Sequence, residues 1–288
     1  MSPLAQGIAT DLDRQRAQGT LRLISIPPCP ALLVRLQTTL AAAEPDLQEV
    51  ARIAGSDVAT SVTLLRNANS ARFSADQPVR TVGQALNRLG LNASAHLLTE
   101  TLMRQVIRAE HPRLQRFWER SALRAATMHH LAQMLPGVTP ELAQLYGLFC
   151  HVGIPVLLQR MPGYSDTLAE AQARKDRSTI ETENQNHRTD HAVVGALVAR
   201  VWQVAPAVVA AIRLHHDLAF LSSPHQDAEV QTLVALGWLA DGIVLEHEGR
   251  ALAHYWPRQA KAVRDFLGIS EHEIEAWGHA LHPVLDAI

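Results

Sequence analysis

The 288-residue sequence has little cysteine and little lysine, with two residues of each. Cys29 and Cys150 are too few for a disulfide framework and favour a reducing compartment. The formal net charge of −2 gives no basic footprint for nucleic acid or an anionic membrane surface. The first 20 residues contain no apolar signal-peptide core, and no uncharged apolar run reaches the length of a membrane span. We therefore expect a cytoplasmic protein that contacts neither nucleic acid nor membrane.

Strand signals are also missing, because no stretch shows a convincing period of two. Apolar residues spaced three and four apart recur almost everywhere, and 47% of the residues are hydrophobic, enough for a core. Helix caps are predicted at Ser56 or Asp57, and at Ser270 with Glu273. The sequence predicts an all-α fold with two helical sub-bundles that are divided near residue 110. We expect an extension over residues 1–21 with a short, solvated helix at 7–18, an N-terminal sub-bundle over 22–110, and a C-terminal sub-bundle over 111–288.

Side chains of the kind that bind metals follow several predicted helices of the second half. An apolar helix ends in the segment 147–153 (GLFCHVG), and two adjacent ligand-type residues precede its final glycine. All-helical domains build metal sites in their core from side chains on different helices. The candidate ligands here are Cys150, His151, His191, His215, His216 and Asp241.

Several motifs resemble the HDOD family, the HD-related output domains of bacterial signalling proteins. In the N-terminal half they are 26–30 (IPPCP), 56–58 (SDV), 64–73 (LLRNANSARF) and 82–90 (VGQALNRLG). In the C-terminal half they are 117–121 (FWERS), 147–153 (GLFCHVG), 191–195 (HAVVG) with Trp202 and Pro206, and 212–216 (IRLHH). The resemblance covers about residues 22 to 245, and it implies that the C-terminal sub-bundle is HD-like.

The departures from the family pattern bear on activity. In HD-type phosphohydrolases, histidines and aspartates bind one or two divalent metals, and the metal activates a water molecule. The resemblance places Arg120, Cys150 and His151 at the expected His, His and Asp positions. A shift of one residue would place His151 at the histidine and Val152 at the aspartate, with the same consequence. Arginine cannot be a ligand, and the bridging carboxylate of a two-metal site is missing. We therefore predict a degenerate site with no catalytic residue and no bound metal.

Two alternatives remain open at these positions. Cys150, His151, His191 and His215 could hold one borderline metal such as zinc or iron, although their spacing follows no standard zinc motif. Otherwise the histidines form a buried hydrogen-bonded network left from an older site. For Arg120 we expect either a surface ion pair or a salt bridge to Asp241 or Glu119 that replaces the charge of a metal. For Cys150 we expect a small buried side chain rather than a nucleophile.

The sequence thus predicts a stand-alone, non-catalytic HDOD-type regulatory protein of bacterial signal transduction, a pseudo-enzyme that acts by protein–protein or small-ligand binding. The partner would be another signalling protein or a small ligand such as a cyclic dinucleotide; the oligomeric state is left open. One alternative is a residual metal-dependent phosphohydrolase acting on a nucleotide or cyclic dinucleotide. Bound metal and turnover that is lost on adding a chelator would support it. Another is a nucleotide-binding module that uses the degenerate pocket, with Arg120 contacting phosphate.

Overall fold

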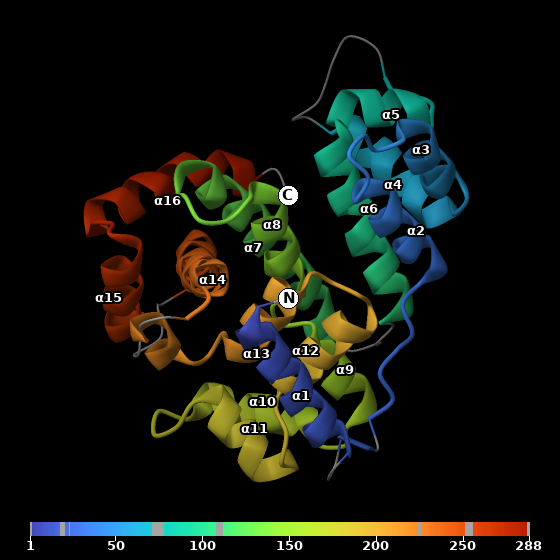
Figure 1. Ribbon diagram of the computed structural model, residues 1–288. Helices are drawn as coiled ribbons and strands as arrows, with labels where there is room; N and C mark the ends of the chain where they lie inside the picture. Colours follow the sequence, from blue (N-terminus) through green and yellow to red (C-terminus); the bar gives the residue numbers. More distant parts are fainter. Residues whose placement is uncertain are drawn as a thin grey trace. The chain divides into compact units, whose positions relative to one another are not determined.

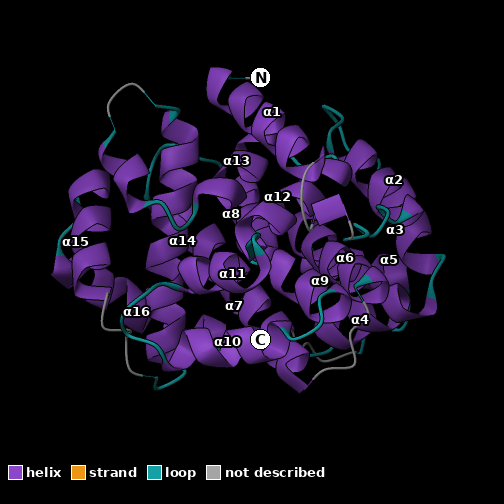
Figure 2. Ribbon diagram, turned by 90° about the horizontal axis from the view of Figure 1, so that it is seen from below, coloured by secondary structure: helices purple, strands orange, loops and turns teal. Residues whose placement is uncertain are grey.

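The computed structural model describes residues 2–17, 21–22, 24–70, 78–107, 112–223, 226–250 and 256–286, without the side chains of 112, 113, 115 and 256–258. Every regular element in these ranges is a helix, and none of them contains a strand (Figure 2). The predicted all-α fold class is confirmed.

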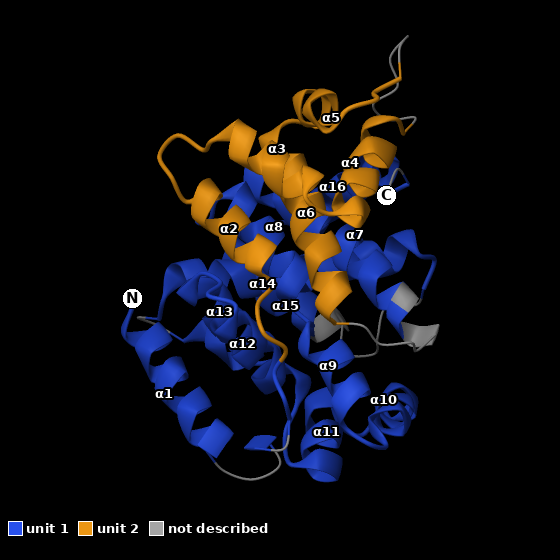
Figure 3. Ribbon diagram, turned by 90° about the vertical axis from the view of Figure 1, so that its right-hand side faces the viewer, with its two compact units in different colours: residues 1–26, 109–286, 288 blue, residues 27–108, 287 orange. Residues whose placement is uncertain are grey.

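The chain forms two compact units (Figure 3). Unit 2 comprises residues 27–108, and unit 1 comprises residues 1–26 together with 109–286. The sequence places the corresponding division near residue 110. Residues 1–26 group with the C-terminal part of the chain instead of standing apart as an extension.

The described residues of unit 2 form a bundle of five helices whose apolar sides make a core that includes Leu33, Ile53 and Leu64. Asp57 caps α4, because its carboxylate accepts a hydrogen bond from the backbone N–H of Thr60 at 2.9 Å. The helices are α2 (Ala31–Leu40), α3 (Leu47–Gly55), α4 (Val58–Ala68), α5 (Val82–Leu89) and α6 (Leu91–Val106).

Unit 1 contains the remaining helices (Figure 1). They are α1 (Pro3–Ala17), α7 (Pro112–Met134), α8 (Pro140–Phe149), α9 (Gly153–Arg160), α10 (Tyr164–Ala173), α11 (Thr179–His187), α12 (His191–Val201), α13 (Pro206–Leu214), the 3₁₀ helix η3 (Leu218–Ser222), α14 (Ala228–His247), α15 (Trp256–Leu267) and α16 (Glu271–Leu285). The predicted capping box of α16 is present, with Ser270 and Glu273 each bonding the backbone N–H of the other.

Helix α14 lies at the centre of unit 1 and packs against α7, α8, α13, α15 and α16. Most of its residues are buried, as expected for a helix that is apolar on nearly all sides. Helices α7 and α8 also pack closely, because Gly147 brings the two backbones together. A Cβ atom at Gly147 would lie 2.8 Å from the Cα atom of Ala125. The chain segment that ends in Cys150 and His151 is therefore held against α7.

The first helix differs from the sequence expectation. It begins at Pro3, and Ala5, Ile8 and Leu12 are buried along one face. Helix α1 packs on α12 and α13 (Figure 1). Arg200 of α12 donates a hydrogen bond to the carbonyl oxygen of Ala9 at 2.7 Å. The prediction of a solvated helix over 7–18 is therefore wrong, and α1 covers the outer side of the two helices that carry site residues.

Two stretches are apolar and long enough to cross a membrane by length and composition, residues 140–160 and 228–247. Both stretches contain charged residues, among them Glu141 in the first and Asp241 in the second, so neither is the uncharged run that the sequence analysis looked for. Their most apolar windows are 61% and 72% buried inside the protein. Packing in the core of unit 1 accounts for this composition, because the core helix of a globular domain passes the same test.

Candidate functional site

Four histidines meet where three helix ends of unit 1 converge. His151 lies in the turn after α8, His191 is the first residue of α12, and His215 and His216 follow the last residue of α13. The packing of α9 on α12 sets this convergence, because Gly153 touches the start of α12. A Cβ atom at Gly153 would lie 2.0 Å from the carbonyl oxygen of His191, so a side chain there would force the two helices apart.

One nitrogen of each ring points toward a common centre. His151 Nδ1 lies 3.3 Å from His191 Nε2, and His215 Nε2 lies 3.2 Å from each of these two atoms. His216 Nε2 lies 3.0 Å from His191 Nε2. All four nitrogens lie within 4.8 Å of one another. We call this set of His151, His191, His215 and His216 the histidine cluster.

The outward-facing ring nitrogens of three of these histidines have acceptors of their own. His191 Nδ1 lies 2.9 and 2.8 Å from the two carboxylate oxygens of Glu183, which is fully buried on α11. His215 Nδ1 lies 2.6 Å from the carbonyl oxygen of Ile212. His151 Nε2 lies 3.5 Å from Oδ2 of Asp241. When these rings are neutral, the contacts favour the proton on the outward nitrogen, which leaves a lone pair on the inward one.

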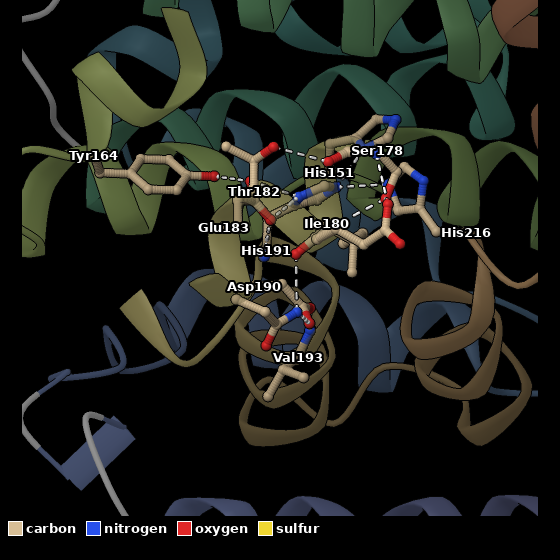
Figure 4. Close-up of polar contacts among 12 residues, drawn as sticks. His151, Tyr164, Ser178, Ile180, Thr182, Glu183, Asp190, His191, Val193 and His216 are labelled. Atoms are coloured by element: carbon tan, nitrogen blue, oxygen red, sulfur yellow. Dashed lines mark hydrogen bonds and ion pairs between the residues drawn. The ribbon is translucent and has the colours of Figure 1, made fainter. Parts of the chain in front are cut away.

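Glu183 is itself fixed by further hydrogen bonds (Figure 4). The hydroxyl of Tyr164 donates to Glu183 Oε1 at 2.5 Å, and the backbone N–H of His191 donates to Oε2 at 3.0 Å. Burial raises the pKa of the Glu183 carboxyl, but the charge and hydrogen bond of His191 outweigh it, so the pKa is lowered. Glu183 is therefore an ionised, immobile acceptor behind His191.

Asp241 on α14 lies between the histidine cluster and a buried arginine. Arg124 Nε donates to Asp241 Oδ1 at 2.6 Å, and the Arg124 side chain is 8% exposed. Burial acts to raise the pKa of Asp241, yet the Arg124 charge and the contact with His151 hold it well below the usual range. Asp241 is thus a carboxylate whose charge is already balanced by an arginine.

The cluster is largely neutral at pH 7. Burial lowers the pKa of His151 to about 4, and the charge of Arg124 acts in the same direction. Burial and the neighbouring histidines hold the pKa of His215 and His216 well below the usual range. Burial acts the same way on His191, but the Glu183 charge outweighs it and raises the pKa. Neutral imidazole is the form that binds metals.

The structure brings together five of the predicted site residues and separates two. His151, His191, His215, His216 and Asp241 are neighbours, as described above. Cys150 instead faces the hydroxyl of Tyr146 at 3.4 Å, and burial raises the pKa of its thiol to about 12. Arg120 Nε donates to Glu248 at 2.8 Å, and its Nη2 also contacts that carboxylate.

Two of these placements correct a sequence expectation. Arg120 forms a partly exposed ion pair with Glu248, which agrees with the ion-pair alternative, whereas the salt bridge to Asp241 or Glu119 is wrong. The guanidinium that bonds Asp241 belongs to Arg124, one helical turn later. The fourth donor atom near the centre is Nε2 of His216 and not the sulfur of Cys150, because the turn at 150–152 directs the thiol toward Tyr146.

Three residues of the site, Arg124, Glu183 and Tyr164, are not predicted from the sequence. Glu183 lies in a polar stretch whose capping box at Ser178 and Glu181 predicts a helix, and this was the available signal. Nothing in that stretch marks Glu183 as its buried residue.

The donor set suits one cation better than two. HD-type chemistry with two metals needs a bridging carboxylate, and His151 provides an imidazole at the position where the resemblance expects an aspartate. In the described part of the chain, the carboxylates that contact the cluster are Asp241, which is paired with Arg124, and Glu183, which lies behind His191. Four nitrogen donors around one centre are a set that zinc accepts.

A family model for the HDOD domain matches residues 26–218. An uncharacterized protein of Treponema pallidum (strain Nichols) is 25% identical over 283 residues, which are 97% of this chain and 53% of that protein. The chain thus spans about half the length of this curated relative.

Solved structures share the fold at low sequence identity. An HDOD domain protein of unknown function from Geobacter sulfurreducens aligns with a TM-score of 0.72 at 18% identity, covering 98% of this chain and 94% of that one. A candidate signal transduction protein of Marinobacter aquaeolei VT8 gives 0.75 at 19% identity, covering 98% and 64%. A candidate phosphohydrolase of Shewanella amazonensis SB2B gives 0.71 at 20% identity, covering 96% and 94%. These similarities agree on the helical fold.

Proposed function

Because this chain belongs to the HDOD domain family, we propose that it is a regulatory protein whose HD-like site does not hydrolyse phosphoesters. It acts in signal transduction by binding another signalling protein or a small ligand, and its location is the bacterial cytoplasm. The name of the Marinobacter structure, which refers to signal transduction, is in line with this role.

One observation supports the proposal: His151, at the position where the family resemblance expects an aspartate, contributes an imidazole nitrogen to the cluster. Its Nδ1 is 3.3 Å from His191 Nε2 and 3.2 Å from His215 Nε2. The nearby carboxylate of Asp241 is occupied by Arg124 at 2.6 Å. Among the described residues, no carboxylate at the cluster is free to bridge two metals around an attacking water, which supports a site that does not hydrolyse phosphoesters.

The competing function is that of a phosphohydrolase, because the names of the two Shewanella structures refer to phosphohydrolases. Nucleotide binding through Arg120 has less support, because that guanidinium is bonded to Glu248. We therefore test turnover first.

The experiment is a phosphoesterase assay of the full chain with zinc, manganese or ferrous iron. The substrates are bis(p-nitrophenyl) phosphate and a cyclic dinucleotide. The control is the His191→Gln/His215→Gln variant, which removes two buried cluster side chains. We expect equal, background rates for the two proteins. Metal-dependent turnover that disappears in the variant would refute the proposal in favour of a hydrolase.

A further inference from the structure

The histidine cluster has the dimensions of a metal-binding polyhedron. With zinc–nitrogen bonds of about 2.0–2.1 Å, the nitrogens of a tetrahedral site lie roughly 3.3–3.4 Å apart. The inward nitrogens of His151, His191 and His215 form a triangle with edges of 3.3, 3.2 and 3.2 Å. His216 Nε2 is 3.0 Å from His191 Nε2 and within 4.8 Å of the other two nitrogens. Three nitrogens thus match one face of the tetrahedron, and a shift of the half-buried His216 side chain toward the other two would complete it.

The hydrogen bonds around the cluster orient its rings in the way that the second-layer acceptors of a metal site orient the ligating histidines. Histidines that bind metals donate their other N–H to a carboxylate or a backbone carbonyl, which fixes the tautomer. His191 has Glu183 in this role, His215 has the carbonyl of Ile212, and His151 has Asp241. Each of these acceptors lies on the outward side of its ring, so the inward nitrogens present lone pairs to one another.

Converging lone pairs need a shared positive charge. Two neutral acceptor nitrogens 3.2 Å apart cannot hydrogen-bond to each other, and buried polar atoms without partners are costly. A proton on His191 Nε2 can be donated to one neighbour at a time. A cation at the centre binds all of them at once, and the rings of His151, His191 and His215 already have the distances that it needs.

We propose that His151, His191, His215 and His216 bind a single divalent metal ion that accepts four nitrogen ligands, with zinc as the best fit. Four protein ligands fill a tetrahedral coordination shell, as in structural zinc sites, and leave no position for a water nucleophile. The metal links the ends of α8, α12 and α13 and stabilises unit 1. The inference goes beyond the proposed regulatory function and does not depend on it.

The test is zinc binding to the full chain after removal of metal with a chelator. Stoichiometry is measured by elemental mass spectrometry, and affinity by competition with a chromophoric chelator. We expect about one zinc ion per chain, as a single tetrahedral site requires.

Variants separate this ligand set from the alternatives. His216→Gln changes the half-buried member and should lower the affinity roughly tenfold or more, as for the loss of a metal-site contact. Cys150→Ser should retain zinc with unchanged affinity, because the thiol faces Tyr146. The matched control is His272→Gln, an exposed histidine in the first turn of α16, which should also leave the affinity unchanged. Circular dichroism of each variant checks that it is folded.

Several results would overturn the inference: no zinc retained, no fixed stoichiometry, equal affinity in His216→Gln, or loss of zinc in Cys150→Ser. Cobalt gives an independent readout that needs no variant. The site should show the intense visible absorption of tetrahedral Co²⁺ without a thiolate charge-transfer band, and the presence of that band would refute the four-histidine set.

The outcome is separable from that of the turnover assay. Zinc binding without turnover supports both proposals. Zinc binding with turnover keeps the ligand set and refutes the non-catalytic function. Absence of zinc binding refutes the ligand set and leaves the non-catalytic function in place.

Discussion

Two arginines one turn apart on α7 offer a controlled measurement of what burial does to an ion pair at this site. Arg124 is 8% exposed and pairs with Asp241, which is 28% exposed. Arg120 is 31% exposed and pairs with Glu248, which is 23% exposed. Arg124→Ala and Arg120→Ala remove the same atoms from the same helix, so the difference between them reports the environment of the two pairs.

The two substitutions should differ clearly in their effect on the free energy of unfolding. An exposed ion pair contributes about 0–1 kcal/mol, so Arg120→Ala should change stability little. Breaking a buried pair from one side costs roughly 3–5 kcal/mol, because the remaining charge stays desolvated. The partial exposure of Asp241 places Arg124→Ala at the lower end of that range, about 3 kcal/mol.

Urea unfolding followed by tryptophan fluorescence measures this difference in unit 1 alone. The five tryptophans all belong to unit 1, and they are Trp118, Trp202, Trp238, Trp256 and Trp277. The double variant Arg124→Met/Asp241→Leu serves as a control, since replacing both partners with apolar residues should recover most of the loss. Equal losses for the two arginines, or no recovery in the double variant, would refute the assignment of Arg124 as the buried charge of the site.

Three further changes test other parts of the molecule. Gly153→Ala places a Cβ atom 2.0 Å from the carbonyl oxygen of His191, so it should lower stability by roughly 1–3 kcal/mol and weaken zinc binding; an unchanged urea midpoint would contradict the close approach of α9 and α12. Glu183→Gln should lower zinc affinity about tenfold or more in the same titration, and unchanged affinity would show that the outer carboxylate does not tune the site. Asp57→Ala removes the cap of α4 and should cost about 1 kcal/mol in unit 2, measured by amide hydrogen exchange. The backbone N–H of Thr60 holds the pKa of Asp57 below its ordinary value of 3.8. The stabilisation by the cap is therefore present above pH 3.8 and is lost as the pH falls through the folded-state pKa. A difference in amide-exchange protection between the unsubstituted chain and Asp57→Ala that persists at lower pH would contradict the cap.

Local signals in the sequence predicted local structure well. The cap at Asp57 and the capping box at Ser270 and Glu273 follow from hydrogen bonds between residues two or three apart, which a sequence displays directly. The burial of helix α1 does not follow from the sequence, because its stripe of Ala5, Ile8 and Leu12 is sparse and lies among polar residues. Its burial depends on α12 and α13, which come almost 200 residues later.

The site shows the same division between local and long-range information. The histidines could be selected from the sequence because few side chains ligate metals and because their motifs resemble those of a family. The choice between Arg120 and Arg124 could not be made, since both lie on the same helix and their partners, Glu248 and Asp241, are more than 100 residues away. Likewise, adjacent residues in a turn point in different directions, and the sequence does not say whether Cys150 or its neighbour faces the cluster.

The central claim is that the HD-like site of this chain binds a metal ion and does not hydrolyse phosphoesters. Its most direct test measures metal content and phosphoester turnover on one sample of the full chain, after zinc loading and exhaustive dialysis. The account predicts about one metal ion per chain and a rate equal to that of the His191→Gln/His215→Gln variant. Turnover above that rate, lost together with the metal on chelation, would contradict it.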